Sequence, residues 1–108
     1  MNKPARSWNS FMEEQLADPG EARSYLELAI QEYQQDHDLA AFLIALRHIV
    51  NAQGGIGRLA KRTGLRRRHL YRVLSNEGNP RFETIIKIVN ALNLRIEKLG
   101  VHPEGALP

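Results

Sequence analysis

The chain has 108 residues, of which 43% are hydrophobic and 25% charged, and these values predict one soluble globular domain and exclude a low-complexity or collagen-like protein. The chain has no cysteine, so it has no disulfide, thiolate zinc site or cysteine nucleophile. It also lacks a long apolar run and a secretory signal, so we expect a cytoplasmic protein with no membrane partner. Residues 1–53 hold 4 Lys/Arg and 8 Asp/Glu (net −4), whereas residues 54–108 hold 11 and 4 (net +7). An acidic first half is therefore joined to a basic second half.

The N-terminal residues 1–19 are predicted to form a loosely docked arm. Trp8 and Phe11 are large apolar side chains in a polar setting, and such groups seek either the protein's own core or another chain. We favour the protein's own core. The run Asp18-Pro19-Gly20 predicts the start of a helix, with the proline just inside it.

Two amphipathic helices are predicted before residue 54. The first covers about 20–34, and its apolar side chains recur at helical spacing: Ala22, Tyr25, Leu26, Ala29, Ile30 and Tyr33. The second begins after Asp38 as N-cap, ends at Gly54-Gly55, and carries a second apolar stripe: Leu39, Phe42, Leu43, Leu46, Ile49 and Val50.

Three shorter helices are predicted in the basic half. The third covers about 57–63 and the fourth about 67–75, and the Gly64-Leu65 pair between them is long enough only for a tight turn. A loop at 76–80 precedes the fifth helix, whose expected inward side chains are Phe82, Ile85, Ile86, Val89 and Leu92.

The C-terminal end of the fifth helix is expected at Asn93, which can adopt the left-handed conformation wanted there. Residues 94–97 alternate like a short edge strand, and residues 100–108 form a disordered tail. The sequence thus predicts an all-α fold of about five helices, with one helical domain at 20–99.

Residues 56–75 have the pattern of two helices that cross at a steep angle. Ala60 is small enough for the crossing and Gly64 tolerates a positive φ in the turn, while Leu59, Leu65, Leu70 and Val73 fill the space between the helices. With that face buried, the second helix must direct a polar face outward: Arg67, Arg68, Tyr71, Arg72 and Ser75.

The same segment is strongly basic and contains no acidic residue, so we expect that nothing local neutralises its charge; its Lys/Arg are Arg58, Lys61, Arg62, Arg66, Arg67, Arg68 and Arg72. A charge run is often only a solvated helix face, but here Arg66, Arg67 and Arg68 gather at a helix N-terminus, where the macrodipole disfavours cations. Arg66 also takes the N-cap position, where Ser or Asp would be more stabilising. Bound phosphates would relieve both costs, and guanidinium groups suit phosphate oxygens and the O6/N7 edge of guanine.

Several short runs carry a resemblance to a known family. Over about 54–94 the sequence resembles the pattern of the Cro/C1 (Xre)-type helix-turn-helix family. The runs that carry this resemblance are Leu59-Ala60, Gly64-Leu65, Leu70-Tyr71, Val73-Leu74 and Gly78-Asn79-Pro80. Five further runs in the first half make the chain similar to the addiction-module antidote branch of that family. They are Asp18-Pro19, Tyr25-Leu26, Phe42-Leu43, Ala45-Leu46-Arg47 and Gly54-Gly55. The resemblance implies a phage-repressor-like domain and an antitoxin that represses its own operon.

The resemblance also implies which residues bind DNA. The family's base-contacting positions fall on Arg67, Arg68 and Arg72, and positions near the backbone or neighbouring bases fall on Arg66, Tyr71 and Ser75. Asn76 and Asn79 would lie near phosphates, and the first helix of the pair adds Arg58, Lys61 and Arg62. Two departures concern caps: the family usually has Ser-type residues where Arg66 and Gly57 stand, and often Gly where Asn93 stands.

The implied partners are a palindromic double-stranded DNA operator, a second copy of the chain and a RelE-like toxin. The second copy would pair through residues 94–96 or the C-terminal face of the last helix. The acidic helix at 20–34 is equally compatible with a solvated face, but such a toxin is typically basic, so the helix would complement its charge.

Other functions are less well supported by the sequence. His37, His48, His69 and His102 lack metal-ligand spacing, no nucleophile, base and orienting group share a recognisable spacing, and no cofactor is expected. An enzyme is the weakest interpretation. A stand-alone repressor without a toxin and a protein-interaction module that does not bind DNA remain the alternatives.

Overall fold

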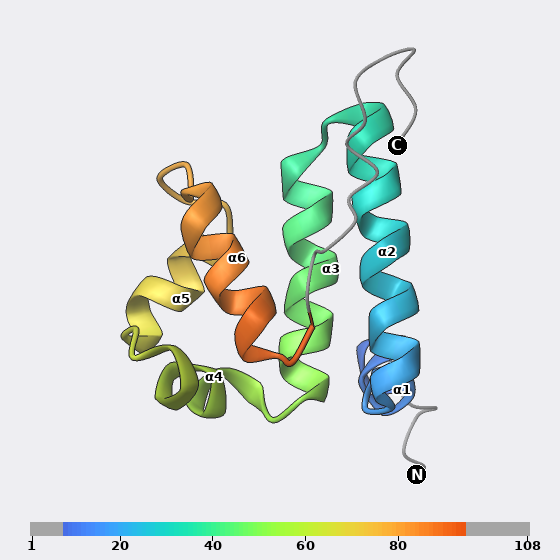
Figure 1. Ribbon diagram of the computed structural model, residues 1–108, viewed down its shortest axis with the longest axis horizontal. Helices are drawn as coiled ribbons and strands as arrows, with labels where there is room; N and C mark the ends of the chain where they lie inside the picture. The colour runs from blue at the N-terminus through green and yellow to red at the C-terminus, as the bar shows by residue number, and fades with distance from the viewer. Residues whose placement is uncertain (1–7, 95–108) are drawn as a thin grey trace, which may run out of the picture.

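The computed structural model describes residues 8–94, which form six helices and no strand (Figure 1). The helices are α1 (Trp8–Leu16), α2 (Pro19–Asp36), α3 (Leu39–Ala52), α4 (Gly55–Thr63), α5 (Arg67–Leu74) and α6 (Phe82–Ala91). The predicted all-α class is confirmed, with six helices in place of about five. The expected strand from Leu94 onward and the tail at 100–108 fall outside the described residues, apart from Leu94 itself.

The additional helix is α1, which replaces most of the expected N-terminal arm. Met12 and Leu16 are buried where α1 packs against α2 and α3, and the Gln53 side chain donates a hydrogen bond to the Leu16 carbonyl at 2.8 Å. The expectation that Phe11 joins the core is wrong, because its side chain is 46% exposed. The surroundings of the Trp8 side chain lie outside the described part of the chain. A helix of only 9 residues has too few apolar positions for its period to be recognised.

The starts of α2 and α3 agree with the predicted caps. Asp18 Oδ2 accepts a hydrogen bond from the Glu21 amide at 3.0 Å, and Asp38 Oδ1 accepts one from the Ala41 amide at 3.0 Å. Each bond satisfies one of the amides that have no partner at a helix start. α2 runs two residues beyond the predicted end and stops where His37 turns left-handed, with φ of 56°.

α3 is the central helix of the fold. Its side chains Leu43, Leu46 and Ile49 are completely buried, because α1 and α2 cover one side of α3 and the group α4–α6 covers the other (Figure 1). The apolar stripe predicted for this helix is confirmed, with Leu39 at its partly buried edge. α3 thereby joins the acidic half of the chain to the basic half.

The basic half follows the prediction with small shifts. α4 begins at Gly55, two residues earlier than predicted, because Gly54 supplies a left-handed turn with φ of 116°. The left-handed conformation predicted for Asn93 is confirmed, with φ of 63°. Phe82 was expected to face inward but is 68% exposed, because it is the first residue of α6.

Among the described residues no single helix has the length and apolar composition of a membrane span. Within residues 8–94 only α3 and α4 taken together reach that composition, and these two helices are bent by 95° where they join.

Candidate nucleic-acid interface

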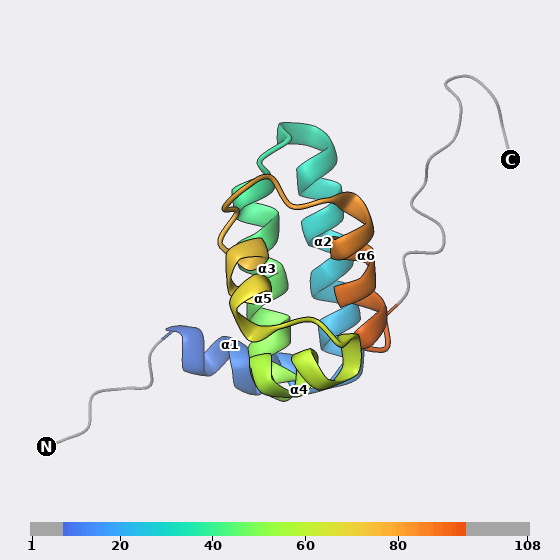
Figure 2. The same cartoon turned by 90° about the vertical axis from the view of Figure 1, so that its left-hand side faces the viewer.

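The pair α4 and α5 is held against the rest of the protein by one apolar face. Leu59 of α4 and Leu70, Val73 and Leu74 of α5 are buried, and α5 packs against both α3 and α4. Figure 2 shows the consequence: α5 lies at the surface toward the viewer, beside α6, with α4 crossing below it. The opposite side of α5 is therefore free to meet a partner.

The turn between α4 and α5 is fixed by a buried threonine that the sequence analysis missed. The Thr63 hydroxyl donates to the Leu59 carbonyl at 2.9 Å and accepts from the Leu65 amide at 3.1 Å. Gly64 follows with a left-handed φ of 76°, as predicted, and its amide donates to the Ala60 carbonyl at 2.9 Å. A Thr directly before the turn glycine was the available signal, since hydroxyls commonly bond nearby backbone groups.

All the side chains predicted to bind DNA belong to exposed residues: Arg58, Lys61, Arg62, Arg66, Arg67, Arg68, Tyr71, Arg72, Ser75, Asn76 and Asn79. At 100° per residue, Arg68, Arg72 and Ser75 lie directly opposite the buried Leu70. We call these three residues the outward face of α5. Tyr71, which is 56% exposed, flanks this face.

Arg67 is turned away from the outward face and toward α4. A Cβ added to Gly57 would lie 2.9 Å from Arg67 Nη2, so the guanidinium group rests on the first turn of α4. Glycine at position 57 has no side chain and so leaves the space for this contact. The structure places Gly57 inside α4, because the helix begins at Gly55.

Arg72 has an acidic neighbour that lies just outside the basic segment. Arg72 Nε is 3.9 Å from Glu77 Oε1, and both side chains are more than half exposed, at 60% and 63%. The expectation that nothing local neutralises the basic segment is therefore wrong at this residue. An exposed ion pair of this length contributes about 0–1 kcal/mol, so Arg72 can exchange Glu77 for another anion at small cost.

Arg62 has a structural contact in addition to its charge. Its Nη1 donates a hydrogen bond of 2.9 Å to the Ala91 carbonyl at the C-terminal end of α6. A helix C-terminus has unpaired carbonyls and partial negative charge, both of which favour a guanidinium group. Arg62 thus ties α4 to α6, whereas Lys61 beside it is an exposed cation with no such bond in the described residues.

The helix starts of the basic half, within the described residues, lack side-chain caps. The N-cap residues of α4, α5 and α6 are Gly54, Arg66 and Arg81, and none makes a side-chain hydrogen bond to its helix. The first amides of each helix therefore keep their partial positive charge and their bonding capacity. Asn76 and Asn79 lie in the loop between α5 and α6 and have left-handed φ angles of 60° and 54°. The backbone conformation of these two residues therefore sets the course of the loop.

The polar contact of Tyr25 with His48 lies in the other half of the protein, between α2 and α3. The two side chains form a hydrogen bond of 3.0 Å between Tyr25 Oη and His48 Nδ1. Burial, and then the nearby Arg47, lower the pKa of His48, and burial, followed by Glu32, raises the pKa of Tyr25. Both side chains are therefore neutral near pH 7.

The histidines of the described chain do not assemble with acidic residues into a metal site. In residues 8–94 no group of three or more His, Cys, Asp or Glu side chains is close enough to hold an ion. His102 lies outside this part of the chain.

Comparison with known proteins adds two findings. A family model described as "Probable addiction module antidote protein" matches residues 9–99, which include nearly all of the described helices. An uncharacterized protein of Haemophilus influenzae is 35% identical over 72 residues, covering 67% of this chain and 73% of that protein. No solved structure matches the chain. The family match spans the acidic and the basic half together.

Proposed function

Because this chain belongs to the probable addiction module antidote protein family, we propose that it is an antitoxin that also represses its own operon by binding operator DNA. The family predicted from the sequence is confirmed at this level, and its narrower placement among Cro/C1-type helix-turn-helix proteins stays a prediction. Family membership supports the antitoxin role over a stand-alone repressor. The DNA-binding role rests on the basic α4–α5 pair.

The observation that carries the DNA-binding role is the combination of arginines and an uncapped helix start on α5. Arg66 and Arg68 are exposed beside backbone amides that no side chain of their helix caps. Each cation there costs roughly 0.3–1 kcal/mol through the helix dipole, and a good N-cap would add about 1 kcal/mol. A bound phosphate offsets these costs together, because it accepts hydrogen bonds from amides and neutralises the guanidinium groups.

In the proposed complex α5 is the recognition helix of a helix-turn-helix and enters the major groove. Its outward face brings Arg68 and Arg72 to base edges, with Ser75 beside them. Arg67 reaches a base only after its guanidinium leaves Gly57, whereas in its present position it lies beside the start of α4. Lys61 then contacts the phosphate backbone and contributes affinity without base preference.

The operator is proposed to be palindromic because a two-fold dimer presents two α5 helices to one side of the DNA. Their separation would match one helical turn, roughly 34 Å. Operator binding also implies that the protein works in the cytoplasm. The toxin, proposed to be RelE-like and basic, would dock on the acidic half, where Glu21, Glu27 and Glu32 are exposed on α2.

A binding assay against the DNA upstream of the coding sequence tests the repressor role. Wild type is expected to bind a palindromic site in this DNA. Lys61→Ala should reduce the slope of the logarithm of the association constant against the logarithm of the salt concentration by about one, while the base preference stays the same. Arg23→Ala on α2 is the matched control in the acidic half, because Arg23 is also an exposed cation on a helix. Equal binding to all duplexes would favour a protein-interaction module instead.

Co-expression with the product of the adjacent gene tests the antitoxin role. Growth rescue together with co-purification of the two proteins is expected. Absence of both toxicity and a complex would leave a stand-alone repressor. Glu21→Gln should weaken the complex and leave DNA binding unchanged, because Glu21 is exposed in the first turn of α2, away from α4 and α5.

A further inference from the structure

Arg67 and Arg68 are neighbours in sequence but have different surroundings on α5. At 100° per residue Arg67 lies about 60° from the buried Leu70, whereas Arg68 lies about 160° from it. Arg67 therefore stands at the edge of the buried face of α5, and Arg68 points away from the protein. The family resemblance implies the same role for both residues, but their positions on the helix differ.

The guanidinium group of Arg67 covers Gly57 on the first turn of α4. A Cβ added to Gly57 would lie 2.9 Å from Arg67 Nη2, 3.4 Å from Cζ and 3.9 Å from Nε. These are the three nearest heavy atoms to that position, so one flat group fills the space beside the glycine. A larger residue at position 57 would compete with the guanidinium group for this space.

The backbone of α4 does not explain the glycine at position 57. Gly54, Gly55 and Gly64, at the two ends of the helix, have φ angles of 116°, 83° and 76°, which favour glycine. Gly57 is not among the residues with positive φ, and it lies inside the helix, where glycine is destabilising relative to alanine. The close approach of Arg67 is the feature of the structure that requires a missing side chain there.

The junction between α4 and α5 is held by packing and hydrogen bonds. The Thr63 hydroxyl bonds to the Leu59 carbonyl and to the Leu65 amide on the two sides of the turn. Leu59 and Leu70 are buried, and the two helices pack against each other. The distance between Gly57 and the start of α5 is therefore fixed by the fold.

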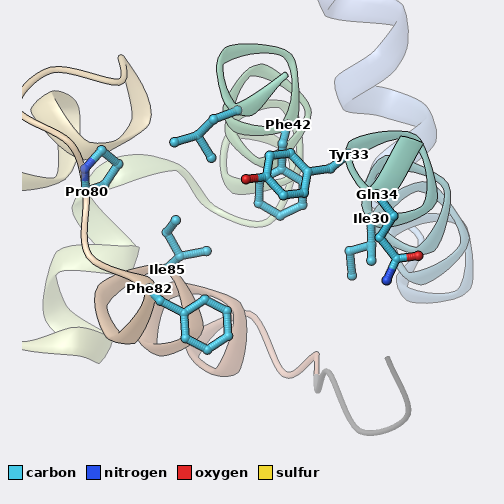
Figure 3. Close-up of a pocket in the computed structure, with 8 residues that line it drawn as sticks. Ile30, Tyr33, Gln34, Phe42, Pro80, Phe82 and Ile85 are labelled. Atoms are coloured by element: carbon cyan, nitrogen blue, oxygen red, sulfur yellow. The ribbon is translucent and has the colours of Figure 1, made fainter. Parts of the chain in front are cut away.

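An apolar hollow of the protein lies away from this junction, where α2 and α3 face the start of α6. Its volume is about 340 Å³, and Tyr33 and Phe42 lie on one wall while Phe82 and Ile85 lie on the other (Figure 3). The residues that line it include none from α4 or α5. The contact between Arg67 and Gly57 is therefore independent of this hollow.

We propose that Gly57 is a positioning residue that keeps Arg67 at the junction of α4 and α5, so that base preference comes from the outward face of α5 and not from Arg67. The inference rests on the proposed binding of operator DNA by α5. In this position the Arg67 guanidinium adds positive charge near the DNA backbone, which raises the affinity for every sequence. Gly57 thereby influences base preference without touching a base.

Binding to operator variants that differ at single bases tests this role. Arg67→Ala is expected to weaken binding to every duplex by a similar factor and to leave the base preference unchanged, in contrast to Arg68→Ala. Gly57→Leu fills the space of the guanidinium and releases Arg67 toward the bases. The preference at one operator position should then change by about fivefold or more, as expected for a new arginine–base contact.

The double variant Gly57→Leu/Arg67→Ala is the matched control and should show the base preference of Arg67→Ala alone. Circular dichroism checks the fold, and Gly57→Ala is the smaller substitution should the leucine variant not fold. Relaxed base preference in Arg67→Ala would overturn the inference, because Arg67 would then read a base in the wild-type complex. A change of preference in Gly57→Leu that persists without Arg67 would also overturn it.

The contact itself can be measured without DNA. In protein with isotope-labelled arginines, the Nε–H group of Arg67 is expected to be more ordered by NMR relaxation than that of Arg68, and Gly57→Leu should remove the difference. If Arg67 is as mobile as Arg68 in wild type, the inference is wrong whatever the DNA result. An ordered Arg67 in a protein that binds no duplex selectively would instead overturn the repressor role, and Gly57 would only hold Arg67 in the free protein.

Discussion

The two halves of this molecule begin their helices in opposite ways. In the acidic half, α2 and α3 start with Asp18 and Asp38, whose carboxylates bond to the first-turn amides. In the described basic half, α4, α5 and α6 start with Gly54, Arg66 and Arg81, which make no such bond. Both halves nevertheless contribute completely buried side chains to the core, such as Leu43 and Leu70.

This difference indicates that the helix starts of the acidic half favour stability, whereas those of the basic half do not. Packing is a requirement of both halves, so it cannot explain why one half lacks caps. Amides and cations left without local partners are costly in the free protein and favourable beside an anion. The basic half therefore gives up some stability at the surface proposed to meet DNA, and the following experiments test that separation.

The largest expected effect concerns the shared core. Leu43→Ala in α3 and Leu70→Ala in α5 should each lower the free energy of unfolding by about 2–5 kcal/mol, because each leaves a cavity at a fully buried position. Chemical denaturation followed by circular dichroism measures this change. The exposed Ile44, mutated to alanine, is the control and should change stability by less than about 0.5 kcal/mol. Two separate unfolding transitions would contradict the single core around α3.

The next effect concerns the outward face of α5. Arg68→Ala should weaken operator binding by about 1–3 kcal/mol and relax base preference, with stability nearly unchanged, because Arg68 is exposed and opposite the buried side of its helix. Fluorescence anisotropy with the operator and with single-base variants measures both quantities. Lys61→Ala is the comparison, and identical behaviour of the two variants would contradict the assignment of α5 as the base-contacting helix.

A smaller effect, of opposite sign in stability and in binding, is expected at Arg66. Arg66→Asp supplies the missing N-cap of α5 and should raise the free energy of unfolding by about 1 kcal/mol while weakening DNA binding. Thermal unfolding and anisotropy on the same samples measure the two changes. If the variant is no more stable, the costs attributed to the uncapped start of α5 are wrong.

The smallest effect is a pH dependence that belongs to the acidic half. Burial lowers the pKa of folded His48, so between the folded and unfolded pKa values the unfolded chain binds more protons. The stabilisation is complete above about pH 6.5 and declines as the pH falls through the unfolded pKa toward the folded one. His48→Gln should flatten this part of the stability curve, as measured by chemical denaturation at a series of pH values.

The sequence alone determined the main helices and the basic segment because their signals are local. Apolar spacing fixed α2 and α3, the Asp caps fixed their starts, and Gly64 and Asn93 marked positions that need positive φ. The arginines of residues 56–75 could be placed on an exposed face from helical period alone, since that period also fixes the buried face.

Only the tertiary structure decided the features that depend on contacts between distant residues. α1 was missed because its helix is short and is stabilised by packing on α3. The positions of Arg67 over Gly57, Arg72 beside Glu77 and Arg62 on the end of α6 depend on how helices and loops meet. The hollow beside Phe82 likewise exists only because α6 stands apart from α2, a spacing that no local pattern of residues encodes.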